Sequence, residues 1–409
     1  MYRFALSPMK DMHIGDLRIA LLTALCAQKN NQRFHVRIED TPKAHTASGK
    51  DQEILHLLSL FGIGYDGLTY QSENLKFHHQ LAATLLAKGK AFSCFCTPEA
   101  LQAKQKEAEE KGNAYRYDGT CEHLSDMDVL ANQSPFTVRI KYDAGSFVLL
   151  GYDKTPTHIF ATAVDDMLQG VKVVLCETPT QGPQQEHIRQ SLGFTEPIHY
   201  LAVPPLATPQ EEPLMESTPL VQMLLDQGFL PQAIANYLLL LSLKTPCEVF
   251  TLDQALTWFD AHLILPSSAP FSMEKLRQLN REHLLAMDDA ALAGLLDFSG
   301  ADFGKLAKLY VKEAATLGEI KPKLHAIFAP KTAPKNAEAS FERVQEALLK
   351  APHFDTLDGL VAHLCAACAV DKTHLLSLLR VLLSGAEEGP ELGALYAIIN
   401  PYLKEIVRS

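Results

Sequence analysis

Apolar and polar positions in the first part of the chain follow patterns that predict strands and helices in turn. Tyr2 to Leu6 has the pattern of a short buried strand, and leucines and alanines recur at helical spacing from Ile14 to Lys29. A second strand is predicted at Phe34 to Ile38, followed by a helix from about Lys50 to Phe61. Strand, helix, strand, helix is typical of the start of a parallel sheet of the nucleotide-binding type.

This alternation is interrupted between Phe92 and Val138, which we interpret as an insertion. The segment carries closely spaced cysteines and a charged helix, predicted from Pro98 to Gly112. Strand-like runs then resume at Ser146 to Leu150, His158 to Val164 and Val171 to Leu175. The sheet is therefore expected to be built from two segments of the chain, one on each side of the insertion.

The second half of the chain has a different pattern. Pro204 to Pro219 is rich in proline and polar residues and predicts an exposed loop. From Leu220 onward the pattern is almost wholly helical, and Phe271 to Ser409 predicts an all-α domain. We expect four parts, with boundaries at residues 1–91, 92–145, 146–270 and 271–409.

Length and charge limit the class of protein. A chain of 409 residues is too long for one core and fits two or three domains. The net charge of −11 gives no global attraction to nucleic acid, so contact with RNA would depend on local basic patches. No apolar run approaches the ~20 residues that span a bilayer, and Met1 to Lys10 lacks the apolar stretch of a secretory signal. We expect a cytoplasmic monomer with no membrane contact.

Four residues of the insertion have the spacing of a metal site. Cys94 and Cys96 are separated by one residue, as are Cys121 and His123, so each pair points to one side of an extended segment. Two such segments can enclose a tetrahedral zinc ion, and no position is then left open for water. The alternative is a set of unrelated thiols and a surface histidine. We predict a structural zinc. Two further cysteines, Cys365 and Cys368, are interpreted as helix-core packing.

The stretch from Ser7 to Arg18 resembles the first signature of class I aminoacyl-tRNA synthetases, in the form used by glutamyl-tRNA synthetases. Further stretches that resemble this family follow in the same order: Arg37 to Thr41, Thr155 to Thr157 with Asp165 and Asp166, Asp226 to Pro231 with Ala235 to Leu238, Ser267 to Phe271, and Lys275 to Asn280. The resemblance implies a Rossmann-type catalytic domain, a zinc-bearing insertion that meets the tRNA acceptor end, and an all-α anticodon-binding-type domain. It also implies ATP-dependent ligation of glutamate to tRNA.

Site residues follow from the same resemblance. Ser7, His13 and Gly15 are expected at an ATP site, because a histidine and a glycine at a strand-to-helix turn place an imidazole and free N–H groups where phosphates bind. The missing side chain of Gly15 is expected to leave room for adenine. Taken alone, His-x-Gly is more often structural. Arg3 and Glu39 are expected in the glutamate pocket. His158 stands there in place of a substrate-contacting tyrosine.

The chain departs from the family where ATP should bind. The family's lysine-rich second signature is expected shortly before Gly228, yet no Lys or Arg occurs between Arg189 and Lys244. Those lysines neutralise charge that develops on the phosphates during adenylate formation. Losing one such donor typically costs ~10²–10³ in rate. Lys10, within the altered first signature, is the hypothetical replacement.

Two further departures affect the amino acid and the tRNA. Cys176 stands where the family has an arginine that grips glutamate, and a thiol cannot pair with a carboxylate as a guanidinium does. After Lys141 the chain lacks a hairpin of the acceptor-binding insertion. We therefore favour a divergent paralogue with impaired or lost aminoacylation that keeps a role in binding tRNA, a small molecule such as glutamate, or a protein partner. The alternative is an active ligase with non-standard residues.

Overall fold

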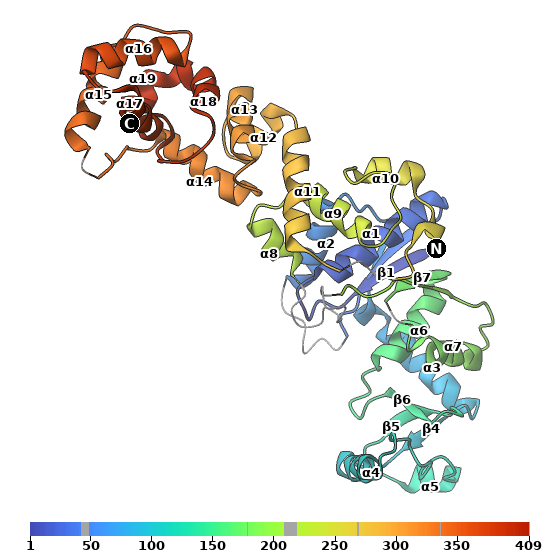
Figure 1. The fold of residues 1–409 in the computed structure, drawn as a ribbon. Helices are drawn as coiled ribbons and strands as arrows, with labels where there is room; N and C mark the ends of the chain where they lie inside the picture. The colour runs from blue at the N-terminus through green and yellow to red at the C-terminus, as the bar shows by residue number, and fades with distance from the viewer. Residues whose placement is uncertain (42–48, 178, 208–218, 268–269, 336, 409) are drawn as a thin grey trace. The chain divides into compact units, whose positions relative to one another are not determined.

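The computed structural model describes residues 1–409 apart from 42–48, 178, 208–218, 268–269, 336 and 409 (Figure 1). The chain divides into two units. Unit 1 consists of Met1–Thr218, Leu241–Thr245 and Asp253–Pro270, and unit 2 consists of Pro219–Leu240, Pro246–Leu252 and Phe271–Ser409.

The predicted parallel sheet is confirmed. Among the described residues of unit 1, a five-stranded sheet has the order β3-β2-β1-β7-β8, with every neighbouring pair parallel. Its strands are β1 (Tyr2–Leu6), β2 (Phe34–Ile38), β3 (Gly67–Tyr70), β7 (Val173–Cys176) and β8 (His199–Ala202). The strands β2 and β3 follow β1 on one side of it, and the later strands β7 and β8 lie on the other side. The strand order therefore reverses between β1 and β7. Ligands of open parallel sheets bind outside the carboxyl ends of strands at such a point.

The helices of unit 1 agree with the sequence pattern at α1 and α2 and disagree at α6. Outside the insertion they are α1 (Ile14–Lys29), α2 (Lys50–Leu60), α3 (Leu75–Ala87), α6 (His158–Gln169), α7 (Gly182–Leu192) and α10 (Leu252–Trp258), with 3₁₀ turns η2 (Gln71–Asn74) and η3 (Ala261–Leu263). The strand predicted at His158 to Val164 is wrong, because this run is the first half of α6. A short apolar run does not distinguish a buried strand from a buried helix, and here it continues at helical spacing to Gln169.

The insertion folds as a small antiparallel sheet with the order β4-β5-β6. Its elements are β4 (Ala91–Cys94), β5 (Thr137–Ile140), β6 (Phe147–Leu150), α4 (Pro98–Glu110) and α5 (Asp126–Ala131) (Figure 1). The strand at β6 and the helix at α4 were predicted, whereas β4 and β5 were not. Phe92, Cys94, Tyr117 and Cys121 form a small buried cluster in this part.

The predicted all-α region is confirmed in unit 2, whose described residues contain no strand. Its helices are α8 (Val221–Asp226), α9 (Pro231–Leu240), α11 (Met273–Ala286), α12 (Asp289–Leu295), α13 (Ala301–Tyr310), α14 (Leu317–Phe328), α15 (Glu338–Lys350), α16 (Leu357–Cys368), α17 (Lys372–Ser384), α18 (Leu392–Ile399) and α19 (Leu403–Arg408), with the 3₁₀ turn η4 (Asn400–Tyr402). All of these helices except α8 contribute side chains to one leucine-rich core. Cys368 lies in this core and Cys365 packs against it.

Candidate functional site

A cavity of about 890 Å³ opens at the carboxyl ends of β1 and β2, beside the amino ends of α1 and α6. Its described wall consists of Leu6, Ser7, Met9, Lys10, His13, Asp16, Glu39, Thr41, Thr155, Pro156, Thr157 and His158. This edge of a parallel sheet, with helix N-termini pointing at it, suits an anionic ligand. The structure thus brings together five of the predicted site residues, namely Ser7, Lys10, His13, Glu39 and His158.

His13 is held at the rim of the cavity by its own helix. The Nδ1 atom of His13 accepts a hydrogen bond from the backbone N–H of Asp16 at 3.2 Å, and the Asp16 carboxylate accepts one from the backbone N–H of His13 at 3.1 Å. This reciprocal cap fixes the start of α1 at Ile14. The same carboxylate lies 3.2 Å from Nε2 of His13. The imidazole is therefore oriented by Asp16.

The space beside Gly15 is bordered by protein groups. A side chain on Gly15 would lie 3.0 Å from the His13 ring and 3.5 Å from a carboxylate oxygen of Glu177. Glu177 follows β7 and pairs with the fully buried Arg18, with 2.9 Å between Nη2 and Oε1. A carboxylate therefore stands next to the predicted nucleotide position, and the cation that pairs with it lies beneath the surface.

Carboxylates crowd this end of the cavity. Burial raises the pKa of Asp16 above its ordinary value, and the nearby charge of Glu177 adds to the rise. The His13 ring, its backbone N–H and the charge of Lys10 act in the opposite direction without cancelling it. A further negative group close to Asp16 is therefore unfavourable.

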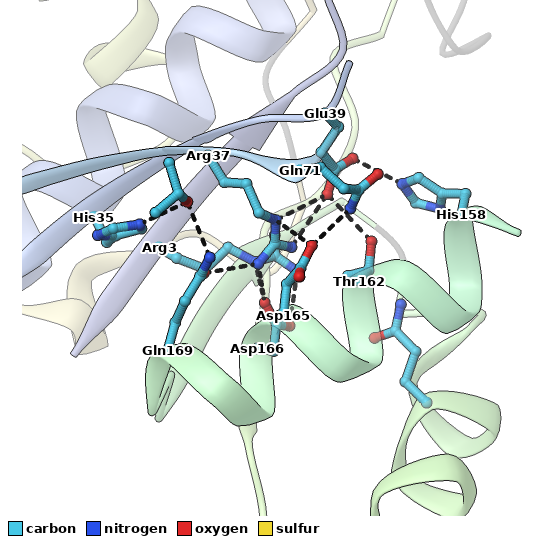
Figure 2. A network of polar contacts seen from close by, with 12 residues as sticks. Arg3, His35, Arg37, Glu39, Gln71, His158, Thr162, Asp165, Asp166 and Gln169 are labelled. Carbon is cyan, nitrogen blue, oxygen red and sulfur yellow. Dashed lines mark hydrogen bonds and ion pairs between the residues drawn. The ribbon is translucent and has the colours of Figure 1, made fainter. Parts of the chain in front are cut away.

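Behind the cavity, two arginines and three acidic residues form a buried network (Figure 2). Arg3 contacts Asp166 through two nitrogens, at 3.0 and 3.1 Å. Arg37 is fully buried and reaches three carboxylates: Asp166 at 2.6 Å, Glu39 at 3.1 Å and Asp165 at 3.9 Å. Asp166 thus pairs with both arginines. The network ties β1 and β2 to α6.

Glu39 links this network to the cavity. Its carboxylate accepts one hydrogen bond from the hydroxyl of Thr162 at 3.1 Å and lies 2.8 Å from Nε2 of His158 (Figure 2). Burial acts to raise the pKa of Glu39, but the hydrogen bond to His158 and the positive charges of Arg37, His158 and Arg3 outweigh it, so that the pKa falls well below its ordinary value. The same hydrogen bond raises the pKa of His158. Glu39 is therefore an ionised carboxylate at the cavity wall.

Cys176 lies at the end of β7, and its thiol is neutral. Burial raises the pKa of its thiol, and the effect of Arg3 in the opposite direction is smaller. Neither Arg3 nor Cys176 belongs to the described wall of the cavity. The charge of Arg3 acts on this thiol, and Arg3 already pairs with Asp166.

In the insertion, Cys94, Cys96 and Cys121 come together. Their sulfur atoms lie within 4.8 Å of one another, with 3.7 Å between those of Cys96 and Cys121. Among the described residues this group does not include His123, which is exposed. The hydroxyl of Tyr117 instead lies 3.3 Å from the sulfur of Cys94 and 3.5 Å from that of Cys96.

Sequence reasoning assigned no role to two of these residues. Arg37 lies in one of the stretches that resemble the family, and a charged side chain in a strand expected to be buried indicates a buried ion pair. The sequence pattern predicts no role for Tyr117, and its position four residues before Cys121 is the signal that was available. The predicted second-signature region, Pro209 to Pro219, lies almost wholly outside the described residues.

Comparisons with known proteins agree on one family. Residues 1–150 match a family model described as tRNA synthetases class I (E and Q), catalytic domain. The chain is 43% identical over 431 residues to Glutamate–tRNA ligase 1 of Campylobacter curvus and 40% identical over 432 residues to Glutamate–tRNA ligase 2 of Campylobacter jejuni subsp. doylei, in both cases over 100% of each chain.

Solved structures share the fold. The crystal structure of a glutamate–tRNA ligase from Elizabethkingia meningosepticum in complex with its amino acid has a TM-score of 0.80 at 21% identity, covering 100% of this chain and 98% of that one. Glutamate–tRNA synthetase from Elizabethkingia anophelis gives a TM-score of 0.78 with the same identity and coverage. In the described residues, every helix is too short or too polar to cross a bilayer.

Proposed function

The chain belongs to the glutamate–tRNA ligase family, and from this premise we propose that it is a divergent member in which adenylate formation is impaired or lost while binding of tRNA or of a small ligand is kept. The reaction of the family is the ATP-dependent ligation of glutamate to tRNA. The family provides the fold and the position of the cavity. Catalysis additionally requires charged groups that the fold alone does not supply.

The charge of the cavity carries this proposal. Its described wall has one Lys or Arg side chain, that of Lys10, and two carboxylates, those of Asp16 and Glu39. Glu177 adds a third carboxylate beside Gly15. No Lys or Arg occurs in the sequence between Arg189 and Lys244, which includes the region outside the described residues. Negative charge that develops on the phosphates during adenylation would therefore meet few cations.

A magnitude can be attached to this deficit. Removal of one preorganised donor from a transition state typically costs ~10²–10³ in rate, or ~3–4 kcal/mol of activation free energy. The family's second signature supplies more than one lysine, and acidic side chains near the same place add repulsion. Turnover at the rate of an ordinary synthetase is therefore not expected.

The amino-acid pocket supports the same proposal. Ionised Glu39 offers a partner for the ammonium group of an amino acid. The groups proposed to face the side-chain carboxylate of glutamate are Arg3, two nitrogens of which already contact Asp166, and the neutral thiol of Cys176. We propose that amino groups are still bound at Glu39 and that the specific grip on a γ-carboxylate is weak.

Cofactor, metal and location complete the proposal. Ser7, His13 and Gly15 are proposed to border the nucleotide. The chemistry of three clustered thiols fits zinc, which thiolates bind at about 2.3 Å. Zinc bound here would crosslink the start of the insertion, at Cys94 and Cys96, to the loop at Cys121. A cytoplasmic location and a tRNA partner are proposed from the family.

The test is ATP–pyrophosphate exchange with glutamate, with and without tRNA. We expect exchange far below that of a synthetase from the same family measured in parallel. The variant Cys176→Arg restores a guanidinium near Arg3 and is expected to tighten glutamate binding, whereas Cys247→Arg, at an exposed cysteine, is the matched control with no effect. Exchange at an ordinary synthetase rate in the unmodified chain would overturn the proposal.

Binding to tRNA is measured separately. Affinity for tRNA at two salt concentrations shows whether phosphate contacts are made, because each neutralised phosphate lowers the affinity as salt rises. We expect measurable binding with a clear salt dependence. A flat salt response, or no binding, would remove tRNA from the proposed ligands and leave a small molecule or a protein partner.

The second candidate is an active ligase. Lys10 lies in the cavity wall, and full-length relatives at 43% identity carry the name of the ligase. In this alternative Lys10 supplies the charge that the family's lysines supply elsewhere. The exchange assay separates the two candidates directly.

A further inference from the structure

His158 is bound to one of the two carboxylate oxygens of Glu39. The other oxygen, Oε1, is held from behind the cavity, by Nη2 of Arg37 at 3.1 Å and by the hydroxyl of Thr162 at 3.1 Å. Among the described residues, the side-chain contact at Oε2 is that with Nε2 of His158 at 2.8 Å (Figure 2). Glu39 and His158 both belong to the described wall of the cavity. A ligand that reaches Glu39 from the cavity therefore meets the oxygen that His158 already contacts.

Of these two side chains, His158 is the one that can move away. The side chain of Glu39 is 8% exposed and that of His158 is 59% exposed. Glu39 is also fixed by Arg37 and Thr162, whereas His158 is the first residue of α6 and its ring extends from the helix end. Exposed side chains change rotamer rapidly, and such a change at His158 leaves the helix in place. His158 is therefore the displaceable partner of Glu39.

The strength of this contact depends on whether His158 carries a proton. A hydrogen bond with an ionised partner is roughly twice as strong as one between neutral groups. The hydrogen bond to Glu39 is the main cause that raises the pKa of His158, and the charge of Glu39 and the side chain of Gln181 act in the same direction. Burial and the charge of Arg3 act against them. Glu39 therefore holds the protonated ring more firmly than the neutral ring, and a rise in pH weakens the contact.

Other charged and titratable groups surround this pair. Histidine is the side chain whose ordinary pKa lies between about 5 and 8, so most of these groups keep their charge near neutral pH. His13 is the second histidine of the described wall, and Asp16 beside it has a raised pKa, so the experiment must separate both from His158. The groups concerned are Arg3 on β1, Arg37 on β2, Asp165 and Asp166 on α6, Cys176 and Glu177 at and after the end of β7, and Lys10, His13 and Asp16 in the described wall.

We propose that His158 competes with the amino group of the ligand for Oε2 of Glu39, so that an amine binds as His158 moves out and gives up its proton. This rests on the binding of amino groups at Glu39 proposed above. The proton passes from the imidazolium to solvent, and the ammonium group of the ligand takes its place beside the carboxylate. Because the unliganded protein then holds more protons than the complex, linkage requires the affinity for an amine to rise with pH while His158 of the unliganded protein titrates, and to level off above that range.

The test is calorimetry of L-glutamate binding to the full chain between about pH 5 and about pH 8, in pairs of buffers with different ionisation enthalpies. The amino group of free glutamate keeps its charge over this range. We expect the affinity to rise roughly threefold to tenfold, since a change of one pKa unit on displacement corresponds to a factor of ten. Up to one proton should be released per glutamate bound. Glutarate has the same two carboxylates and no amino group, and its affinity should not rise with pH.

Substitution of His158 identifies the group that titrates. His158→Gln keeps a hydrogen-bond donor and removes the proton, so its affinity for glutamate should be independent of pH and binding should release no proton. His56→Gln, at an exposed histidine of α2, is the matched control and should behave as the unmodified chain does. A pH dependence that persists in His158→Gln would come from His13 or Asp16 and would overturn the proposal.

The ring of His158 gives a second measurement, on the unmodified chain. Its NMR titration with and without saturating glutamate should show a lower pKa in the complex, because the ligand removes the contact with Glu39; an unchanged or higher pKa overturns the proposal. Glutamate affinity that does not vary with pH also overturns it, and leaves amine binding at Glu39 intact. If glutamate does not bind at any pH, the binding of amino groups at Glu39 fails as well, while the exchange assay still decides the question of ligation.

Discussion

Replacing Arg37 with methionine tests whether the buried network stabilises unit 1. Methionine keeps an unbranched, flexible side chain and removes the guanidinium with its charge. In the structure the guanidinium contacts Asp166 at 2.6 Å and Glu39 at 3.1 Å, and the residue has no exposed surface. Breaking a buried ion pair by removing one partner typically destabilises a protein by ~3–5 kcal/mol, because the remaining charge stays buried without compensation.

The remaining contacts place the expected loss near the lower end of that range. After the substitution, Asp166 keeps its two contacts with Arg3, and Glu39 keeps those with His158 and Thr162. No carboxylate is left without a partner. We therefore expect Arg37→Met to lower the free energy of unfolding of unit 1 by about 3 kcal/mol.

A single tryptophan makes the measurement specific. Trp258 is the one tryptophan of the chain and belongs to unit 1, so its fluorescence during urea titration reports that unit even if unit 2 unfolds separately. Arg33→Met is the control, since the side chain of Arg33 is exposed just before the same strand; its effect should stay within about 0.5 kcal/mol. A loss below about 1 kcal/mol for Arg37→Met, or equal losses for both variants, would refute the reasoning.

Four further outcomes are expected. Folding lowers the pKa of Glu39, so ionised Glu39 contributes to the stability of unit 1 above the ordinary pKa of 4.5, and this contribution is lost as pH falls below that value. Unfolding followed by tryptophan fluorescence should therefore show that unit 1 of the unmodified chain loses more stability on acidification than unit 1 of Glu39→Gln. Folding raises the pKa of His158, so its contribution is lost as pH rises through that value; the difference in Tm between the unmodified chain and His158→Gln should shrink towards alkaline pH, and a constant difference would contradict this. Lys10→Ala should abolish any residual pyrophosphate exchange, and an unchanged rate would exclude a catalytic part for Lys10. Chelation of zinc should speed hydrogen exchange in the segment from Phe92 to Leu124 without affecting the helices of unit 2. If the chelator leaves the exchange rates of this segment unchanged, the result would argue against a structural metal.

Local patterns were sufficient for the elements nearest the cavity. The strands β1 and β2 and the helix α1 were predicted with their observed bounds, because each has an uninterrupted pattern of its own period and a clear break at both ends. The first residues of α6 were misread as a strand, since the apolar run from His158 to Val164 is too short to show its period. The pattern was therefore reliable only where a run was long enough.

The buried network and the Tyr117 contact were beyond the reach of such patterns. Arg3 and Asp166 are separated by 163 positions in the sequence, and their pairing depends on how β1 and α6 are placed in the fold. The contact between Tyr117 and Cys94 likewise joins a loop to the end of β4. Spacing within a segment identifies pairs of ligands, but it does not reveal which residue of another segment lies beside them.

Apart from Glu39, which belongs to both, the charges of the buried network are separate from those of the described cavity wall. Arg37 and Asp166 are fully buried, and their loss is costly in stability. Lys10 lies in the cavity wall and the side chain of Glu177, beside Gly15, is 39% exposed; exposed charges contribute little to folding. A member of the family can therefore exchange the cations of the cavity for neutral or acidic groups while its fold stays intact. For this reason full-length identity of 43% to a ligase establishes the family, whereas ATP–pyrophosphate exchange measured on this chain decides its activity.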